Sequence, residues 1–286
     1  MLEIQIDRDT SVTQLLPLLE QADASPYDLT QVAEEKCRGD GHDGPPTLLL
    51  AYANKIAVGL AVASSNAVRL LVVDREHRRK GVGTALLRRS EQIVAANGHR
   101  RAVLAAEPGN YLIPGVWDES ETAVAFAEAS GYVTHEEAMN LEVPLHDSTY
   151  LTHPSTRAIR AQLPDRERVL DFIGSEFGKI WRFESQRAFV TDSPTIFFAE
   201  DERGEVCGFS AHEANNRGLG WYGPAGVRQS QRRSGLGREL LVASLQDLRD
   251  LGHTRAIIPW AAAVGFYEKV SGARPLHRFR RYTKEM

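Results

Sequence analysis

Residues 227–237 read Val227-Arg-Gln-Ser-Gln-Arg232-Arg-Ser-Gly235-Leu-Gly237, and residues 73–83 read Val73-Asp-Arg-Glu-His-Arg78-Arg-Lys-Gly81-Val-Gly83. In both stretches an apolar run leads into a polar turn rich in arginine and glycine, and a second apolar run follows. This order predicts a strand, a tight turn and a helix. The first N–H groups of a helix have no partner within it, and the helix dipole adds positive charge there. Because glycine lets an anion approach the backbone, we expect each turn to hold a phosphate or pyrophosphate.

The two stretches belong to a longer internal repeat. When residues 73–105 are aligned with residues 227–259 without a gap, 13 of 33 positions are identical, including both turn glycines and the leucine pair that follows. A repeat of this length predicts two copies of one supersecondary unit, and a chain of 286 residues agrees with about two domains. We place a linker in the turn-rich residues 147–154, which leaves domains at residues 1–146 and 155–286.

Hydrophobic periodicity and turn residues predict the same plan in both halves. In the first half we expect strands at 2–6, 47–52, 56–64, 68–73 and 101–105 and helices beginning at 12 and covering 27–37, 82–96 and 122–129. In the second half we expect strands at 156–161, 195–200, 206–213, 219–227, 255–260 and 277–283 and helices beginning at 165 and covering 236–251 and 264–270. The loop at 107–121, rich in proline, glycine and acidic residues, is expected to form a lid or wall.

Charge and cysteine content narrow the class of protein. The net charge is −4, with −9 on residues 1–150 and +5 on residues 151–286, an excess too small to indicate nucleic-acid binding. The N-terminus has no secretory signal pattern, and no apolar run approaches the roughly 20 residues that span a bilayer. Cys37 and Cys207 offer neither a disulfide framework nor a metal motif. We therefore expect a cytoplasmic protein with no nucleic-acid, membrane or metal partner.

The repeated turn resembles motif A of the GCN5-related N-acetyltransferase (GNAT) family, which reads Arg-x-x-Gly-x-Gly followed by Leu-Leu. Dinucleotide-binding and Walker patterns fit less well, because Leu86 and Leu240 occupy the third glycine position and no Gly-Lys-Ser/Thr follows. Downstream, the run Ala263-Val-Gly-Phe266-Tyr267-Glu-Lys269 resembles the next signature of the family. The resemblance covers nearly the whole chain and is similar in arrangement to tandem two-domain members such as mycothiol synthase.

This resemblance implies an α/β (α+β) fold of two tandem GNAT domains. Each would have a mixed, mostly antiparallel central sheet that splays at the acetyl-CoA site and is flanked by helices. Acetyl-CoA would be the co-substrate. In the second copy the resemblance implies cofactor contacts from Val227, Arg232, Arg233, Ser234, Gly235, Leu236, Gly237, Arg238, Phe266 and Tyr267. In the first copy the matching residues are Val73, Arg78, Arg79, Lys80, Gly81, Val82, Gly83 and Thr84.

The resemblance also implies that the two copies have different roles. The N–H of Val227 would polarise the thioester carbonyl, and Tyr267 would be the general acid for the departing thiolate. The first copy carries Ala127 where the second carries Tyr267. We therefore expect a catalytic second domain and a non-catalytic first domain, which either binds acetyl-CoA or only supports the other.

The acceptor side and the base are less well defined. Glu213 is a candidate base, with His212, Glu184 or a chain of water molecules as alternatives. Trp181 and Glu184 fall where the family's acceptor wall lies, so both are candidate substrate contacts. Trp260 occupies a position where the family often has asparagine, and it would either stack on substrate or fill the floor of the cleft.

The expected function is N-acetyl transfer to a primary amine of a small molecule. The acidic residues 118–121 would favour a polycationic acceptor such as an aminoglycoside or polyamine if they overhang the second cleft. The alternatives are a non-catalytic acyl-CoA-binding or regulatory module and an acetyltransferase of protein N-termini or lysines. The chain would act as a monomer or a homodimer.

Overall fold

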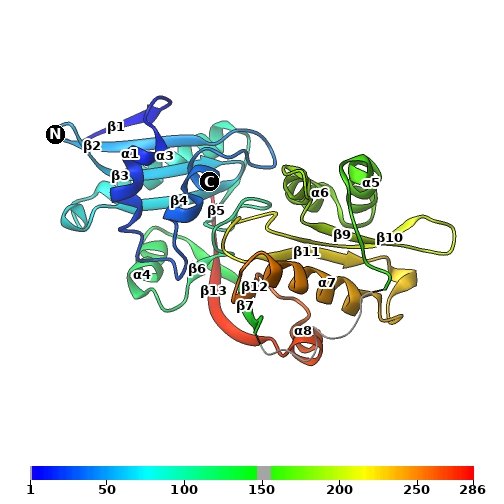
Figure 1. Cartoon of the computed structure of the whole chain (residues 1–286). Helices are drawn as coiled ribbons and strands as arrows, with labels where there is room; N and C mark the ends of the chain where they lie inside the picture. Colours follow the sequence, from blue (N-terminus) through cyan, green and yellow to red (C-terminus); the bar gives the residue numbers. More distant parts are fainter. Residues whose placement is uncertain (1, 147–155) are drawn as a thin grey trace. The chain divides into compact units, whose positions relative to one another are not determined.

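The structure is a computed structural model that describes residues 2–146 and 156–286, and it contains two compact units (Figure 1). Unit 1 comprises the residues up to Met139 together with His277–Met286. Unit 2 comprises Asn140–Leu276. The expected domains, 1–146 and 155–286, therefore differ from the compact units. Unit 2 begins at Asn140 and not at residue 155, and it ends at Leu276 and not at residue 286.

Unit 1 is built on a mixed sheet with the strand order β1-β2-β3-β4-β5-β13. All neighbouring strands are antiparallel except β4 and β5, which are parallel. The strands of this unit are β1 (Leu2–Asp7), β2 (Thr47–Ala53), β3 (Ile56–Ser64), β4 (Ala67–Val73), β5 (Arg101–Leu104), β6 (Val116–Trp117) and β7 (Val133–Pro144), which runs on into unit 2. The last strand of the chain, β13 (Arg274–Glu285), enters unit 1 at His277.

Helices cover both faces of the unit 1 sheet, with α1 and α3 on opposite sides of β2 to β4 (Figure 1). The helices are α1 (Val12–Leu19), the 3-10 turn η1 (Thr30–Val32), α2 (Ala33–Cys37), η2 (Arg75–His77), α3 (Val82–Ala96) and α4 (Glu121–Ala129). Helix α3 buries Val82 and Leu86 against Leu49, Ala51 and Val58 of the sheet. This apolar contact fixes the helix directly after the first arginine-glycine turn.

Unit 2 repeats the arrangement with a four-stranded antiparallel sheet in the order β11-β10-β9-β8. Phe198 of β9 packs with α5, while the next residue back, Phe197, packs with α7, because successive side chains of a strand point to opposite faces. The strands are β8 (Ile159–Arg160), β9 (Ile196–Glu200), β10 (Val206–His212), β11 (Tyr222–Val227) and β12 (Arg255–Ile258). The helices are η4 (Leu163–Asp165), α5 (Arg166–Phe177), α6 (Lys179–Gln186), η5 (Arg187–Phe189), η6 (Gln229–Gln231), α7 (Leu236–Asp250) and α8 (Val264–Ser271).

The two halves of the chain exchange their last strands. Residues Leu141–Pro144 of β7, from the first half, pair with β12 in unit 2. Residues Thr283–Glu285 of β13, from the second half, pair with β5 in unit 1. This exchange is the physical reason for the difference from the expected boundary. The expected linker at 147–154 lies outside the described residues.

Several local expectations also needed correction. The expected helix at 27–37 is only the turn η1 followed by the short α2, and the expected strand at 156–161 is reduced to β8. The expected strand at 219–227 begins at Tyr222, because Gly218 and Gly220 adopt positive φ angles in the turn before it. In contrast, α3 has the predicted bounds and α7 ends within one residue of its predicted end.

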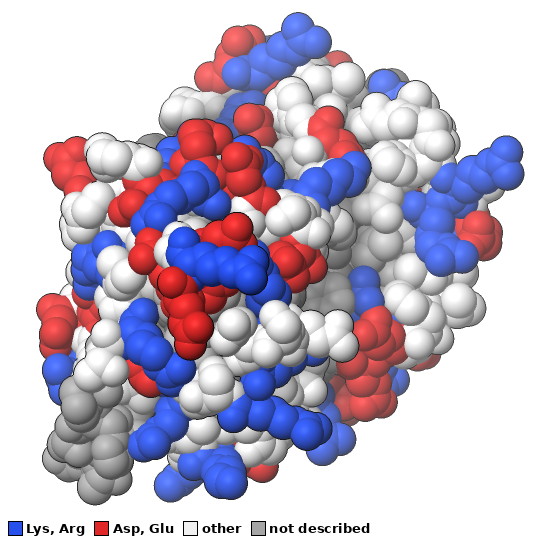
Figure 2. Space-filling view, turned by 90° about the vertical axis from the view of Figure 1, so that its right-hand side faces the viewer, with Lys and Arg blue, Asp and Glu red and all other residues white. Residues whose placement is uncertain are grey.

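The surface in Figure 2 carries interleaved basic and acidic side chains. On α5 and α6, Arg168 pairs with Asp165 and Glu200, and Arg182 pairs with Glu167 and Asp171. These pairs keep much of the positive charge of unit 2 locally neutralised. In the parts of the chain that the structure describes, none of the helices has the length and apolar character needed to cross a membrane.

Candidate active site

The two arginine-glycine turns adopt the same backbone conformation. Arg79 and Gly81 have φ angles of 60° and 82°, and the matching Arg233 and Gly235 have 65° and 86°. Gly81 and Gly235 are the N-caps of α3 and α7. Glycine tolerates this left-handed conformation without steric cost, so the repeated glycine is explained by the turn itself.

Both turns present a series of free backbone N–H groups. Among the residues that the structure describes, the backbone N–H groups of residues 79–84 and 233–237 donate no hydrogen bond to another residue. The first N–H bonds of each helix come later, from Ala85 to Gly81 at 3.0 Å and from Arg238 to Gly235 at 3.0 Å. Consecutive free N–H groups at a helix N-terminus are a favourable site for an anion such as a diphosphate.

The first arginine of each turn has a structural contact in common. Arg78 donates from Nε to the carbonyl of Val73 at 3.0 Å, and Arg232 donates from Nε to the carbonyl of Val227 at 3.2 Å. In unit 1 the Arg78 guanidinium also binds Asp23 at 2.8 Å. In unit 2 no further partner of Arg232 lies within the described ranges, and its side chain is exposed. The second turn therefore keeps more of its positive charge available for an anion.

Arg157 lies against the second turn, and sequence reasoning did not identify it. Its guanidinium donates to the carbonyl of Ser234 at 3.0 Å and to Glu239 in the first turn of α7 at 2.6 Å. The nearer guanidinium nitrogen would lie 3.4 Å from a Cβ at Gly235. Arg157 therefore offsets the negative charge of Glu239 at the helix N-terminus, where an acidic side chain would otherwise oppose an incoming diphosphate.

The sheet of unit 2 splays directly before the turn, as the fold prediction required. Directly before β11, Trp221 forms a parallel bridge with Ile257 of β12, and the Ile257 N–H donates to the carbonyl of Gly220 at 2.8 Å. From Tyr222 onward, β11 pairs with β10 alone among the described strands. Unit 1 does the same: β4 pairs with β5 only at Ala67 and Val68. The fold prediction of splayed, mostly antiparallel sheets is confirmed.

Because β12 diverges from β11, some backbone N–H groups of β11 point away from β10 and into the gap between β11 and β12. Arg228 donates its N–H to Cys207 of the β10 side at 2.8 Å. Because N–H directions alternate along a strand, the N–H groups of Ala225 and Val227 point to the other side, toward the gap. The donor expected at Val227 thus has the required direction, and Ala225 provides a second one that the sequence did not reveal.

Tyr267 lies on α8 beside two other aromatic residues. Its ring is edge-on to Tyr222 of β11, with centroids 6.2 Å apart, and to Phe266 at 5.2 Å. Phe266 in turn would lie 3.7 Å from a Cβ at Gly237 of the turn. Burial raises the pKa of Tyr267 above that of a free phenol, so the hydroxyl keeps its proton at neutral pH. This is the protonation state that a general acid needs.

An aromatic cluster covers β11 on the face opposite α7. Gly226 has so little space that a Cβ there would come within 2.5 Å of the Phe177 ring. Trp181 of α6 stacks on Phe177 with centroids 5.3 Å apart and an interplanar angle of 21°, and it remains 36% exposed. The expected wall residue Trp181 therefore presents one open aromatic surface near the strand, whereas Glu184 on the same helix is 6% exposed.

Trp260 follows β12 at the splayed end of the sheet. It has a φ angle of 47°, and its N–H donates to Asn140 Oδ1 at 3.0 Å. Asn140 comes from β7, the exchanged strand, so the first half of the chain helps to shape this end of unit 2.

Glu213 has a different environment from the one expected of a base. Its carboxylate is 5% exposed and accepts N–H groups from Gly218, from Gly220 at 2.9 Å and from Trp221 at 3.2 Å. These bonds hold the turn that leads into β11. Glu213 follows the end of β10, and the β10 residue opposite Val227 is Gly208. These N–H contacts are those of a positioning residue, and the role of Glu213 as base stays a prediction.

His212, the neighbouring candidate, is fully buried and binds Asp247 at 2.6 Å through Nε2. This pair lies between β10 and α7. Within residues 2–146 and 156–286, no group of three or more His, Cys, Asp or Glu side chains lies close enough to hold a metal ion.

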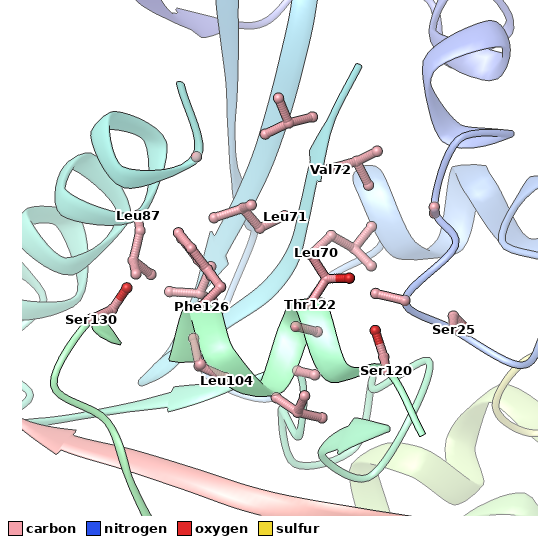
Figure 3. A pocket seen from close by; sticks show the side chains of 18 of the residues that line it. Ser25, Leu70, Leu71, Val72, Leu87, Leu104, Ser120, Thr122, Phe126 and Ser130 are labelled. Carbon is pink, nitrogen blue, oxygen red and sulfur yellow. The ribbon is translucent and has the colours of Figure 1, made fainter. Parts of the chain in front are cut away.

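Unit 1 has a cavity of about 850 Å³ at the place that corresponds to this site (Figure 3). Its lining includes Gly81, Gly83 and Thr84 of the first turn and Phe126 of α4, the counterpart of Phe266. The next residue, Ala127, is fully buried and has no hydroxyl. The sequence identified the missing phenol but gave no sign of the cavity.

The contacts that the sequence did not reveal all join residues that lie far apart in the chain. Phe177 and Gly226 lie 49 residues apart, and Arg157 lies 77 residues before Ser234. Contacts over such separations leave no periodic pattern in a single sequence. One local signal was available: glycine inside a strand often marks close approach by another group, and the run Gly223-Pro-Ala-Gly226 meets that description.

Comparisons with known proteins agree with this geometry. Residues 12–114 and 166–273 match the family model described as the acetyltransferase (GNAT) family. A curated relative, the mycothiol acetyltransferase of Nocardiopsis dassonvillei, is 26% identical over 94% of this chain and 91% of its own length.

Two solved structures share the fold at 17% identity. One, a tandem GNAT protein from the clavulanic acid biosynthesis pathway, has a TM-score of 0.70 and covers 100% of this chain and 98% of its own. The other contains a glucosamine N-acetyltransferase region in a fungal multi-domain β-N-acetylglucosaminidase. It has a TM-score of 0.82, and the match covers 99% of this chain and 38% of that longer chain.

Proposed function

Because this chain belongs to the GNAT acetyltransferase family, whose pattern occurs in both halves, we propose that unit 2 acetylates a primary amine of a small molecule with acetyl-CoA as donor. The observation that carries the proposal is the splayed gap between β11 and β12, which has free N–H groups at one end and Tyr267 beside it. A narrow carrier chain in this gap would place its thioester between the strand and the phenol.

The diphosphate of the carrier would bind the N–H groups of residues 233–237. The exposed side chains of Arg232, Arg233 and Arg238 add positive charge around this turn. Arg157 would contribute from the side, because it already donates to Ser234. An anion held by several N–H groups and flanking guanidinium groups is bound more strongly than by either alone.

The reaction would proceed by direct attack of the neutral amine on the thioester carbonyl. The N–H groups of Ala225 and Val227 would stabilise the negative charge that develops on the carbonyl oxygen. Tyr267 would give its proton to the departing thiolate, the proton lost from the amine would pass to water, and the Tyr267 phenolate would regain a proton from water. The C–N bond forms as the C–S bond breaks, so acetyl transfer is balanced without a covalent enzyme intermediate.

The acceptor would approach β11 from the side of α5 and α6. Trp181 offers a flat apolar surface there, a shape suited to the carbon face of a sugar ring or another compact ring. A relative is named a mycothiol acetyltransferase, and a structural neighbour contains a glucosamine N-acetyltransferase region. We therefore propose an amino sugar or a similar ring-bearing amine as the acceptor class, with Trp260 and Glu184 shaping the site's edges.

Unit 1 would bind CoA through residues 79–84 and would not transfer the acyl group. Its turn has the same conformation and free N–H groups as that of unit 2. The absence of a hydroxyl at Ala127 removes the proton donor for the thiolate. Tight charge pairing of Arg78 with Asp23 should make this turn the weaker diphosphate site of the two.

The test is release of free CoA thiol from acetyl-CoA with a panel of amines, including glucosamine derivatives. Tyr267→Phe should lower kcat about 100-fold while CoA affinity changes little, because only the departing thiolate loses its proton donor. Tyr132→Phe, which removes a buried phenol of unit 1, is the matched control and should keep wild-type kcat. An unchanged kcat in Tyr267→Phe would exclude the role given to this residue.

A further inference from the structure

The cavity of unit 1 extends well beyond the turn that would hold a diphosphate. One part is bounded by Leu71, Leu87 and Phe126, which belong to the side of the sheet covered by α3 and α4 (Figure 3). Another part is lined by Leu70 and Val72, the alternate residues of β4. Because alternate residues of a strand point to opposite faces, the cavity passes through the gap between β4 and β5.

The far part of the cavity is lined mainly by apolar side chains, with Ser25 among its polar residues (Figure 3). In addition to Leu70 and Val72, it is lined by Leu29, from the segment before α2, and by Ile113 from the loop after β5. This is the side from which an acceptor amine would have to approach the thioester. In unit 2 the corresponding side bears the half-exposed Trp181, but in unit 1 it is a chamber lined mainly by aliphatic side chains.

The charged residues around the cavity are largely committed to one another. Asp23 binds Arg78 at 2.8 Å, and Glu91 binds Lys284 at 3.0 Å. Arg69, buried on β4, pairs with the buried Glu107. The lining residues that the structure describes thus provide no unpaired carboxylate for an ammonium group. The remaining cations, Arg79 and Arg88, suit a phosphate.

Helix α4 contributes small side chains to the lining of the cavity. The residues that it contributes to the lining include Ala123, Ala125 and Ala129, all with small side chains. In unit 2, Lys269 of α8 occupies the position of Ala129. An acetyl group alone would leave much of such a chamber unfilled, and unfilled apolar space forgoes contact energy.

From these observations we propose that unit 1 is a binding site for an acyl-CoA with an acyl chain of about four to eight carbons, which it holds without transferring. The diphosphate would lie on residues 79–84, the pantetheine in the gap between β4 and β5, and the acyl chain among Leu70, Val72 and Ile113. The inference rests on the proposed function in one respect, namely that the first turn binds the diphosphate of CoA.

Affinity should therefore depend on chain length. Burial of each further methylene in an apolar site favours binding by a factor of about three to four, so each added pair should tighten binding roughly tenfold until the chamber is full. An acetyl-specific site would show the opposite trend, since a longer chain would clash with its wall.

The two turns allow the sites to be separated in the full-length chain. Gly235→Glu places a carboxylate at the second turn and leaves only unit 1 open, whereas Gly81→Glu leaves only unit 2 open. A Cβ at Gly81 meets no atom within 4 Å, and one at Gly235 approaches only Arg157, so neither change disturbs core packing. Each does place a non-glycine residue at a positive φ, and thermal unfolding of both variants measures the cost of that backbone strain. Calorimetric titration of each variant with CoA, acetyl-, butyryl-, hexanoyl- and octanoyl-CoA measures the preference of each site.

We expect Gly235→Glu to bind one equivalent of hexanoyl-CoA at least tenfold more tightly than acetyl-CoA, with no release of CoA thiol when amines are added. Gly81→Glu should lose this preference and still acetylate the amine. If Gly235→Glu binds acetyl-CoA as tightly as the longer thioesters, or binds no CoA species, the inference is wrong. If Gly81→Glu and the wild type both fail to transfer acetyl, the proposed function fails, whatever the chain-length result.

Val72 provides a second test that does not depend on the turns. In the Gly235→Glu background, Val72→Phe should reduce hexanoyl-CoA affinity to the level of acetyl-CoA, and Val72→Ala should move the preference toward octanoyl-CoA. Val169→Ala, in the core of unit 2, controls for a general loss of stability. Equal effects of all three substitutions on every thioester would contradict the placement of the acyl chain.

Discussion

Burial raises the pKa of Tyr267, and this predicts how the reaction rate depends on pH. Burial disfavours the phenolate, so the pKa lies above the ordinary value of about 10 and the phenol stays protonated throughout the neutral range. The acceptor amine, in contrast, must lose a proton before it attacks. We therefore expect kcat/KM to rise with pH as the amine deprotonates and to show no decline below about pH 9. A profile of initial rates from pH 6 to 10 checks this, and a descending limb near neutrality would contradict it.

Asp247 supports a second prediction at this scale. Burial opposes its ionisation, but hydrogen bonds from His212 and Arg160 outweigh that effect and lower its pKa. A carboxylate with a lowered folded-state pKa stabilises the fold above its unfolded pKa, and this stabilisation is lost as pH falls through the folded value. Urea unfolding at pH 7 should show Asp247→Asn to be about 3 kcal/mol less stable, because it removes the carboxylate that pairs with Arg160.

The difference between Asp247→Asn and the wild type should begin to shrink as the pH falls below about 4, where the unfolded chain protonates this carboxylate, and should be lost below the lower pKa of the native state. Asp250→Asn is the matched control, since its exposed carboxylate on the same helix pairs only with its neighbour Arg249 among the described residues. A constant difference from pH 7 to pH 3 would show that the loss arises from packing and not from charge.

At the scale of elements, the close packing of β11 on α5 leads to a third prediction. Gly226→Val would force its side chain into the Phe177 ring and displace either the strand or the aromatic cluster. Overpacking of this kind typically costs about 1–3 kcal/mol. Because Ala225 and Val227 flank this position, we also expect kcat to fall at least tenfold. Thermal unfolding and thiol release measure the two effects, with Gly265→Ala as control, since a Cβ there meets open space.

The helices and strands that could be predicted from the sequence are those whose ends are set by nearby residues. Helices α3 and α7 were predictable because an N-cap glycine in the repeated turn begins each one and Gly98 or Gly252 follows its end. The bounds of α2 and β8 could not be predicted, because tertiary contacts, and not local periodicity, determine where such short elements begin and end. Within the site, the turns and Tyr267 were visible as motifs. Long-range packing determines the contact of Phe177 with β11, the position of Arg157 and the unit 1 cavity. These features were therefore not visible as motifs.

At the scale of the whole molecule, strand exchange changes how the charge is distributed. The halves of the sequence carry −9 and +5, but assignment of residues to the compact units gives −4 for unit 1 and 0 for unit 2. The basic strand β13 accounts for part of this change, and it forms ion pairs inside unit 1: Arg280 binds Asp118 at 2.6 Å and Lys284 binds Glu91 at 3.0 Å. The charge asymmetry of the sequence is therefore a sign of strand exchange, not of a basic binding domain.

The exchange predicts that the end of the chain stabilises its beginning. Deletion of residues 277–286 would remove the antiparallel partner of β5 together with Phe279 and Tyr282, which are 1% and 0% exposed in unit 1. Loss of two buried aromatic side chains costs about 6–10 kcal/mol, comparable with the whole stability of a small domain. We expect hydrogen exchange to show lost protection in Arg101–Leu104, and unit 1 to lose CoA binding in the Gly235→Glu background.

Residues 159–212 of unit 2 should keep their protection, because β8, β9 and β10 pair only with one another and with β11 among the described strands. Phe279→Ala combined with Tyr282→Ala should reproduce most of the deletion's effect without shortening the chain, whereas removal of Met286 alone should have little effect. If the ten-residue deletion left β5 protected, β13 would not be required for the sheet of unit 1. The two halves could then be separated and studied as independent domains, an outcome that their exchanged pairing argues against.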